Sequence, residues 1–373
     1  MLQWRQYAEV VFSVRKDRVV LILGAGATLA DGQRRPRKSQ PPLDRGFFSN
    51  VLPEYSVVLT PVTKYMQDHY GAGLRDPGRD SLERVMAILY TDVFGGELEE
   101  EAYRALLTLI RFFVYRLATT TNDIRMTPRS LLYRLIVGFL NDGVPAASIT
   151  IVTFNQDMQV EKALDAIQNT KQRAGQPIFS FPHCYNLPQP ASLSAPSDPA
   201  QPRFDIGPDD AEGITVLKLH GSLNWYSLHN SPTPTRARLF DPTRKLGITR
   251  RKSIKTDMTL DVKPGARLKF TFPIVVPPVV HKSGILHQDL RPVWALAEER
   301  LQSANKVVIF GYSCPINDWE SANLVCRALT DNRGLVEISV IDPDPAVLHR
   351  YVDLANLSNV SYYRYAAKYL RAE

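Results

Sequence analysis

The stretch Arg18-Val-Val-Leu-Ile-Leu-Gly24-Ala25-Gly26-Ala-Thr28 decides the fold class, because an apolar run ends directly at a glycine-rich turn. A short apolar run of this kind is typical of a strand buried on both faces of a parallel sheet. Glycines after a first strand let backbone N–H groups approach a pyrophosphate. The usual fingerprint has a third glycine, and Leu29 stands in its place. A tight turn without a ligand is therefore the alternative interpretation.

Similar apolar runs recur along the chain with helical patterns between them. We expect further strands at 147–153, 214–219, 306–310 and 336–341, and helices at 158–167, 291–302 and 318–329. This alternation predicts a Rossmann-like α/β fold: a mostly parallel sheet with helices on both faces.

Between the first two expected strands, apolar residues recur at helical spacing, most clearly at 80–89, 100–117 and 128–140. We therefore expect an inserted helical subdomain at 51–141, in a discontinuous core formed by 1–50 and 142–373. A helix is also expected at 2–16, and loops are expected at 30–50 and 188–208.

Composition excludes several classes of protein. The 373 residues are 44% hydrophobic and 22% charged, which is ordinary for a soluble globular protein. No stretch approaches the roughly 18 continuous apolar residues of a membrane span, and the N-terminus has no signal-peptide core. Three cysteines without a Cys-x-x-Cys pair argue against a disulfide framework and a four-cysteine zinc site. We expect a cytoplasmic protein with no membrane partner.

The net charge of +7 includes two basic clusters, at 34–38 and 244–255. Such clusters can attract nucleic acid or a phosphate-bearing ligand. Solvated loops are the favoured interpretation, because neither cluster has the interleaved aromatic residues of a base-stacking surface. We therefore do not expect direct nucleic-acid binding.

Polar residues also follow the other expected strands, where an open α/β sheet places its ligand. Asn155 and Asp157 follow 147–153, although helix capping is the favoured interpretation of this pair taken alone. His220 ends the next strand, and histidine is the side chain best suited to exchange protons near neutral pH. A histidine satisfied by backbone partners is the alternative. No second metal ligand lies at a suitable spacing from His220, so no metal site is expected.

Two later strand ends continue this pattern. Gly311 and Ser313 follow 306–310, where a glycine permits close approach and a hydroxyl can bond a ribose or phosphate oxygen. Asp342 ends the last expected strand, and an acid in that position commonly binds the adenosine ribose. A turn formed by Asp342 and Pro343 is the alternative.

Taken in order, these motifs resemble the sirtuin-like family, the silent-information-regulator type of NAD-binding domain. The matching segments are Gly24-Ala25-Gly26, Phe154-Asn155-Gln156-Asp157, His220-Gly221 and Gly311-Tyr312-Ser313, followed by Asp342. The segments at 217–225 and 311–315 are most similar to the bacterial branch of this family found in antiphage defence. The resemblance spans nearly the whole chain.

The resemblance implies a role for each matching residue. Asn155 would hold the nicotinamide ribose and the attacking water, Asp157 would bind the carboxamide, and His220 would act as general base. The remaining NAD contacts would come from Gly24, Ala25, Gly26, Thr28, Gly221, Ser222, Gly311, Ser313 and Asp342, with Asp44 and Phe47 in the family's cofactor loop.

Two departures narrow the expected activity. Protein-deacylating sirtuins carry paired Cys-x-x-Cys zinc ligands that this chain lacks, so no zinc is expected. The helical insertion is also larger than in a deacylase. Both favour a NAD hydrolase that uses NAD as substrate and acts as the NAD-depleting effector of antiphage defence by abortive infection. The alternatives are an NAD or ADP-ribose sensor without turnover, and an NAD-dependent deacylase. We expect a homo-oligomer with a regulatory partner such as a HerA-type ATPase or an Argonaute-type protein.

Overall fold

The computed structural model describes most of the expected core and of the helical insertion. The described residues are 18–32, 40–41, 46–74, 80–95, 99–170, 178–181, 183–185, 187, 213–228, 245–248, 273–276, 290–315, 318–355 and 360–372. The expected helix at 2–16, the expected loop at 188–208, the first basic cluster and most of the second lie outside these residues.

Six parallel strands form the central sheet, in the order β3-β2-β1-β7-β8-β9. They are β1 (Val19–Leu23), β2 (Ile149–Thr153), β3 (Thr215–Lys218), β7 (Lys306–Phe310), β8 (Glu337–Ile341) and β9 (Val360–Tyr363). Every residue of β1, β2 and β3 is buried, which explains their nearly continuous apolar sequences. The Rossmann-like α/β class is therefore confirmed, although β9 was not expected.

The strand order creates a switch point at β1. The chain places β2 and then β3 on one side of β1, and later crosses to β7, β8 and β9 on the other side. Leu23, at the end of β1, pairs with Thr153 of β2 and with Phe310 of β7. Open α/β sheets bind their ligands in the crevice outside the carboxyl ends of the strands at such a point.

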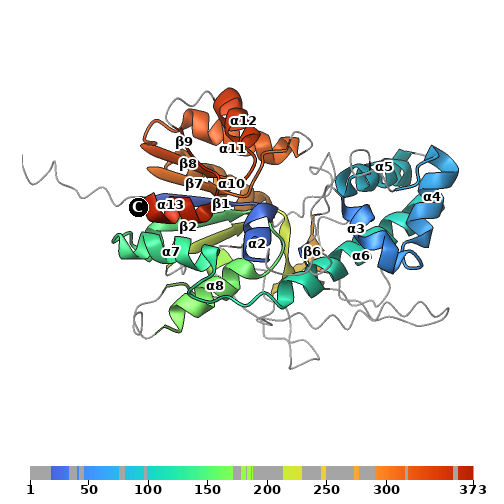
Figure 1. Cartoon of the computed structure of the whole chain (residues 1–373), viewed down its shortest axis with the longest axis horizontal. Coiled ribbons are helices and arrows are strands. Elements are labelled where there is room, and N and C mark those ends of the chain that lie inside the picture. Colours follow the sequence, from blue (N-terminus) through green and yellow to red (C-terminus); the bar gives the residue numbers. More distant parts are fainter. Residues whose placement is uncertain are drawn as a thin grey trace, which may run out of the picture.

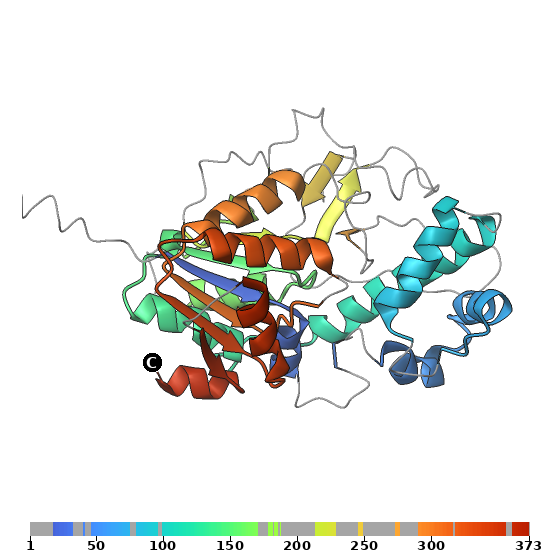
Figure 2. The same cartoon turned by 90° about the horizontal axis from the view of Figure 1, so that it is seen from above.

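Helices cover both faces of the sheet, as Figure 1 shows. One face carries α10 (Leu290–Gln302), α11 (Trp319–Asp331) and α12 (Ala346–Ala355). The other carries α2 (Ala25–Gly32), α7 (Leu131–Asn141), α8 (Gln159–Gln168) and α13 (Ala366–Ala372). Helices α10 and α11 pack side by side over the sheet (Figure 2). Two short 3₁₀ helices, η2 (Ala146–Ser148) and η4 (His183–Tyr185), lie in the connections.

A second hydrophobic cluster, which we call the helical lobe, lies beside the sheet (Figure 1). It is formed by α3 (Phe47–Tyr55), α4 (Thr60–Tyr70), α5 (Leu82–Gly95) and α6 (Glu99–Asn122). Helix α7 was expected within the insertion, but its apolar side chains pack in the core of the sheet. The difference arises because α7 buries one strongly apolar face, which periodicity alone cannot assign to a particular core.

The strand β4 (Gly221–Leu228) begins directly after His220 and forms an antiparallel sheet with β5 (Lys245–Ile248) and β6 (Pro273–Val275). This strand was not expected from the sequence. Gly221 adopts φ +75°, which turns the chain out of the parallel sheet. Leu223 belongs to the helical lobe whereas Trp225 belongs to the core of the sheet, so β4 joins the two clusters.

Among the described helices, none combines the length and the apolar character needed to cross a membrane.

Candidate functional site

The turn between β1 and α2 lies directly against the end of β7. The Gly24 amide donates to the Phe310 carbonyl at 3.2 Å, and the Gly26 amide donates to the Gly311 carbonyl at 3.0 Å. A Cβ atom on Gly24 would clash with the Gly311 carbonyl and lie 2.5 Å from Tyr312 Cα. These glycines are therefore required for backbone packing. Because the Gly26 amide already has a hydrogen-bond partner, a tight turn without a ligand, the alternative interpretation, accounts for this glycine. The neighbouring Ala25 is exposed.

Asn155 is held in one orientation by a short chain of hydrogen bonds. Its Nδ2 donates to the Gly24 carbonyl at 2.8 Å and to Thr28 Oγ1 at 3.1 Å. Thr28 Oγ1 in turn donates to Asp157 Oδ2 at 2.7 Å. Because the carboxylate only accepts, the Thr28 proton points to Asp157 and Thr28 must accept from Asn155. The Asn155 Oδ1 therefore faces away from these hydrogen-bonded groups. It accepts no hydrogen bond from the described residues.

Asp157 is buried and both of its carboxylate oxygens are engaged. The second oxygen, Oδ1, accepts from the amide of Gln159, the first residue of α8, at 2.9 Å. Burial raises the pKa of Asp157, while Lys218, Thr28 and the Gln159 amide act to lower it. Lys218 Nζ also donates to the Asp157 carbonyl. Asp157 thus bonds the first amide of α8, although Met158 is the N-cap residue, and the carboxamide contact stays a prediction.

His220 lies at the carboxyl end of β3, next to the segment that follows β2. Its ring packs against Phe154, with centroids 5.3 Å apart, and more loosely against Trp294 at 6.3 Å. Its Nε2 lies 3.1 Å from Ser321 Oγ and 3.7 Å from Asp318 Oδ2. Neither Asp318, the N-cap residue of α11, nor Ser321 was predicted as a site residue. Asp and Ser at a helix start are ordinary caps, so no local signal distinguished them.

Ser222, expected to contact a ligand, is fully buried in a polar network. Its Oγ donates to Asn224 Oδ1 at 2.6 Å, and Asn224 Nδ2 donates to the Tyr185 hydroxyl at 3.0 Å. The Tyr185 hydroxyl donates to Glu161 Oε1 at 2.7 Å, which also accepts from Lys218 Nζ at 2.9 Å. The structure therefore places Ser222 inside the core and not in the crevice at the carboxyl ends of the strands. A lysine within an apolar strand was the one signal in the sequence for this network.

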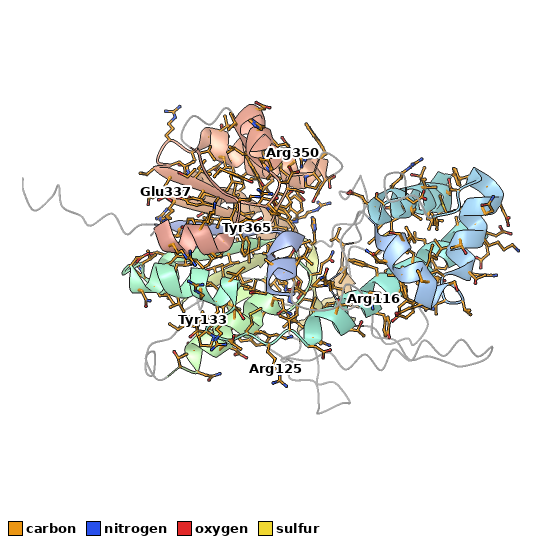
Figure 3. The ribbon with its side chains drawn as sticks, in the orientation of Figure 1. Arg116, Arg125, Tyr133, Glu337, Arg350 and Tyr365 are labelled. Atoms are coloured by element: carbon orange, nitrogen blue, oxygen red, sulfur yellow. The ribbon has the colours of Figure 1, made fainter. Side chains whose placement is uncertain are left out.

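Asp342 and Ser313 lie after the neighbouring strands β8 and β7. Asp342 Oδ1 accepts from the Asp344 amide at 2.9 Å, so the expected alternative, a turn at this position, is formed. Burial raises the pKa of Asp342. Arg350 of α12, labelled in Figure 3, donates to the Ser313 carbonyl at 2.7 Å and lies 3.9 Å from Asp344.

The expected cofactor loop does not reach this site through Phe47. The Phe47 ring is buried in the helical lobe, where it packs edge-on against Phe48 at 5.2 Å and against Phe112 at 6.0 Å. An aromatic residue that begins an amphipathic helix buries its large apolar area more readily in a core than at an open edge. Asp44 lies outside the described residues.

The described residues contain no group of three His, Cys, Asp or Glu side chains that could hold a metal ion. The expectation of no zinc stays a prediction. All three cysteines are buried and free, with Cys314 Sγ and Cys326 Sγ 4.0 Å apart.

No protein-family model and no curated protein matches the chain. Three Sir2 proteins are among the solved structures similar in fold. The first is Sir2Tm bound to a propionylated peptide, with 13% identity, a TM-score of 0.42, and coverage of 99% of this chain and 96% of that chain. The second is Sir2 in complex with the inhibitor EX-527, 2′-O-acetyl-ADP-ribose and deacetylated p53 peptide, with 12% identity, a TM-score of 0.41, and coverage of 99% and 96%.

The third solved structure concerns the mechanism and regulation of Sir2 enzymes, with 11% identity, a TM-score of 0.34, and coverage of 100% of both chains. At sequence identities this low, structural similarity bears on the fold alone. TM-scores below 0.5 add no information about the chemistry of this chain. The sheet and its strand ends define the class: a doubly wound, Rossmann-like α/β protein with polar side chains at its switch point.

Proposed function

We propose that this chain is a NAD hydrolase that cleaves the nicotinamide–ribose bond and releases nicotinamide and ADP-ribose. The observation that supports this best is the strand order, which is the order of doubly wound sheets that bind dinucleotides at the switch point. At this edge, Asn155 and His220 follow the adjacent strands β2 and β3. A dinucleotide across β1 would have its reacting ribose next to both side chains.

The reaction needs a positioned nucleophile more than a strong acid. Breaking the bond between nicotinamide and ribose C1′ leaves the electron pair on the nicotinamide nitrogen and a cationic centre on the ribose. The oriented Asn155 Oδ1 accepts a hydrogen bond from the attacking water or from a ribose hydroxyl, which fixes the geometry of attack. The water oxygen forms the new bond to C1′ and its proton passes to His220. Such a base contributes typically about 10²–10⁴-fold to the rate.

The wider role in this proposal is NAD depletion during antiphage defence by abortive infection. The resemblance of the motifs at 217–225 and 311–315 to the bacterial defence branch supports that part of the proposal. Because uncontrolled loss of NAD would kill the host cell, the proposal includes a homo-oligomer and a regulatory partner such as a HerA-type ATPase or an Argonaute-type protein.

A sensor that binds NAD or ADP-ribose without turnover is the second candidate. The engagement of both Asp157 oxygens favours it, because that carboxylate would otherwise be expected to orient the nicotinamide carboxamide. A sensor predicts saturable NAD binding and no nicotinamide release.

The test is to incubate the purified chain with NAD and to follow nicotinamide and ADP-ribose by chromatography. The reaction is run alone, with candidate partners, and with an acylated peptide. We expect release that is lost in Asn155→Ala and His220→Ala but kept in Asn141→Ala and His349→Ala, which change the same residue types at exposed positions.

Each other outcome has a defined meaning. Equal turnover in the parent and in His220→Ala would refute the mechanism. Release only with an acylated peptide would indicate a deacylase, and binding without release under every condition would favour the sensor.

A further inference from the structure

Two side chains at the start of α11, from its N-cap residue Asp318 and from Ser321, converge on the imidazole of His220. Ser321 Oγ lies 3.1 Å from Nε2, and Asp318 Oδ2 lies 3.7 Å from the same nitrogen. The side chains of His220 and Asp318 are only 9% and 7% exposed, and Ser321 is fully buried. A carboxylate at this distance in a buried site interacts with a positive charge far more strongly than it would in water.

The position of Asp318 in the helix does not explain the direction of its side chain. Asp318 occupies the N-cap of α11, where an aspartate commonly accepts hydrogen bonds from the first helical amides. Its side chain makes no capping hydrogen bond, although its carbonyl accepts from the Ala322 amide at 2.9 Å. The carboxylate is directed to His220 instead, which points to a role beyond helix capping.

Two other titratable groups, the Tyr312 phenol and the Cys314 thiol, feel the charge of Asp318. Phe154 and Trp294 contribute apolar rings. Burial, and then the charge of Asp318, raise the pKa of Tyr312 well above its ordinary value, so this phenol stays neutral. The hydrogen bond with Cys326 and burial, and then the charge of Asp318, likewise raise the pKa of Cys314, so this thiol also stays neutral. Asp318 is thus a negatively charged group 3.7 Å from Nε2 of the imidazole.

We propose that Asp318 is a positioning residue that holds the His220 imidazole in one tautomer, and that Ser321 assists it. This inference rests on the proposed function. The negative charge of Asp318, 3.7 Å from Nε2, favours a proton on that nitrogen, which can then donate to Ser321 Oγ at 3.1 Å. The lone pair is then on Nδ1, which takes the proton from the attacking water or from a ribose hydroxyl. The imidazolium formed in that step is stabilised by the negative charge of Asp318.

The first test compares the pH dependence of NAD turnover in the parent, Asp318→Asn and Ser321→Ala. We expect Asp318→Asn to lose about 10-fold or more of its turnover. A nearby carboxylate raises the pKa of a base. Removing that charge in Asp318→Asn should therefore move the acid limb of the rate profile to lower pH by about one unit. Asp331→Asn removes a charge from the exposed end of the same helix and should leave both quantities unchanged. Thermal unfolding of each variant checks that the fold is kept.

The second test does not depend on activity. In the full chain labelled with ¹⁵N-histidine, the His220 signals are identified by their absence in His220→Ala. We expect the tautomer protonated at Nε2 in the parent, and in Asp318→Asn a mixed tautomer that titrates at lower pH. A tautomer protonated at Nδ1, or a titration that Asp318→Asn leaves unchanged, would overturn the inference.

The two tests also separate this inference from the proposed function. If the parent hydrolyses NAD and Asp318→Asn matches it at every pH, the function stands and the inference fails. If the parent releases no nicotinamide under any condition, the proposed function fails, and the histidine signals alone decide whether Asp318 acts on His220.

Discussion

Replacing Gly311 with alanine should destabilise the fold by far more than an ordinary glycine substitution. Gly311 has φ +63°, and this left-handed conformation costs a residue with a side chain about 1–2 kcal/mol. The new Cβ would also clash with the Ala27 amide nitrogen and lie 2.7 Å from Gly26 Cα. These neighbours are backbone atoms that cannot rotate away, so overpacking adds about 1–3 kcal/mol. The expected loss in the free energy of unfolding is therefore about 2–5 kcal/mol.

Gly143→Ala is the matched control for this substitution. Gly143 has φ +83° and follows α7, which packs in the same core, but no atom lies within 4 Å of an added Cβ. It should lose only the conformational part, about 1–2 kcal/mol. Urea unfolding followed by circular dichroism measures both variants. A loss in Gly311→Ala no larger than in Gly143→Ala would show that the turns after β1 and β7 do not pack as described.

Three further changes test other parts of the site. Thr28→Val removes the group that orients the Asn155 amide, so NAD turnover should fall by about 10–100-fold, and unchanged turnover would contradict the orienting role. The melting temperature should fall as well, because the buried Asp157 carboxylate loses a hydrogen-bond donor. Lys218→Met leaves Glu161 buried without its cation and should cost about 3–5 kcal/mol in urea unfolding, much of which a second change, Glu161→Gln, should restore. Asp342→Asn should raise the melting temperature at pH 7. Because its pKa is raised, the Asp342 carboxyl binds a proton more tightly in the native state than in the unfolded state. The protonated carboxyl therefore contributes stability at low pH, and this contribution is lost as the pH rises above 3.8. The difference between parent and variant should therefore shrink near pH 4, and a constant difference would contradict the sign.

The parallel sheet could be predicted from the sequence because its strands are short, nearly continuous apolar runs that end in polar or glycine residues. Those runs fixed β1, β2, β3, β7 and β8. The strand β9 escaped prediction because its burial is only partial and its sequence, Val-Ser-Tyr-Tyr, has little periodicity. The strand β4 escaped because its buried polar residues, Ser222 and Asn224, are typical of a loop until their partners are known.

For the candidate site, the sequence allowed prediction of residues that follow a strand, but not of residues that only tertiary packing brings to the site. Asn155 and His220 could be proposed as site residues because each follows a strand, which is a local feature of the sequence. Asp318 and Ser321 lie about a hundred residues from His220, and only the packing of α11 over the sheet brings them to it. Phe47 shows the opposite error, because a plausible local motif was assigned to the site when tertiary packing buries it in the helical lobe.

The strand β4 has a consequence for how this protein responds to heat. Leu223 is packed among the helices of the lobe, and His220 lies three residues earlier at the end of β3. An element shared by two hydrophobic clusters makes their melting cooperative, because neither cluster can lose its structure without exposing part of the other. A dinucleotide bound at the ends of the strands would thus protect amides in the helical lobe from hydrogen exchange, at positions that it never touches.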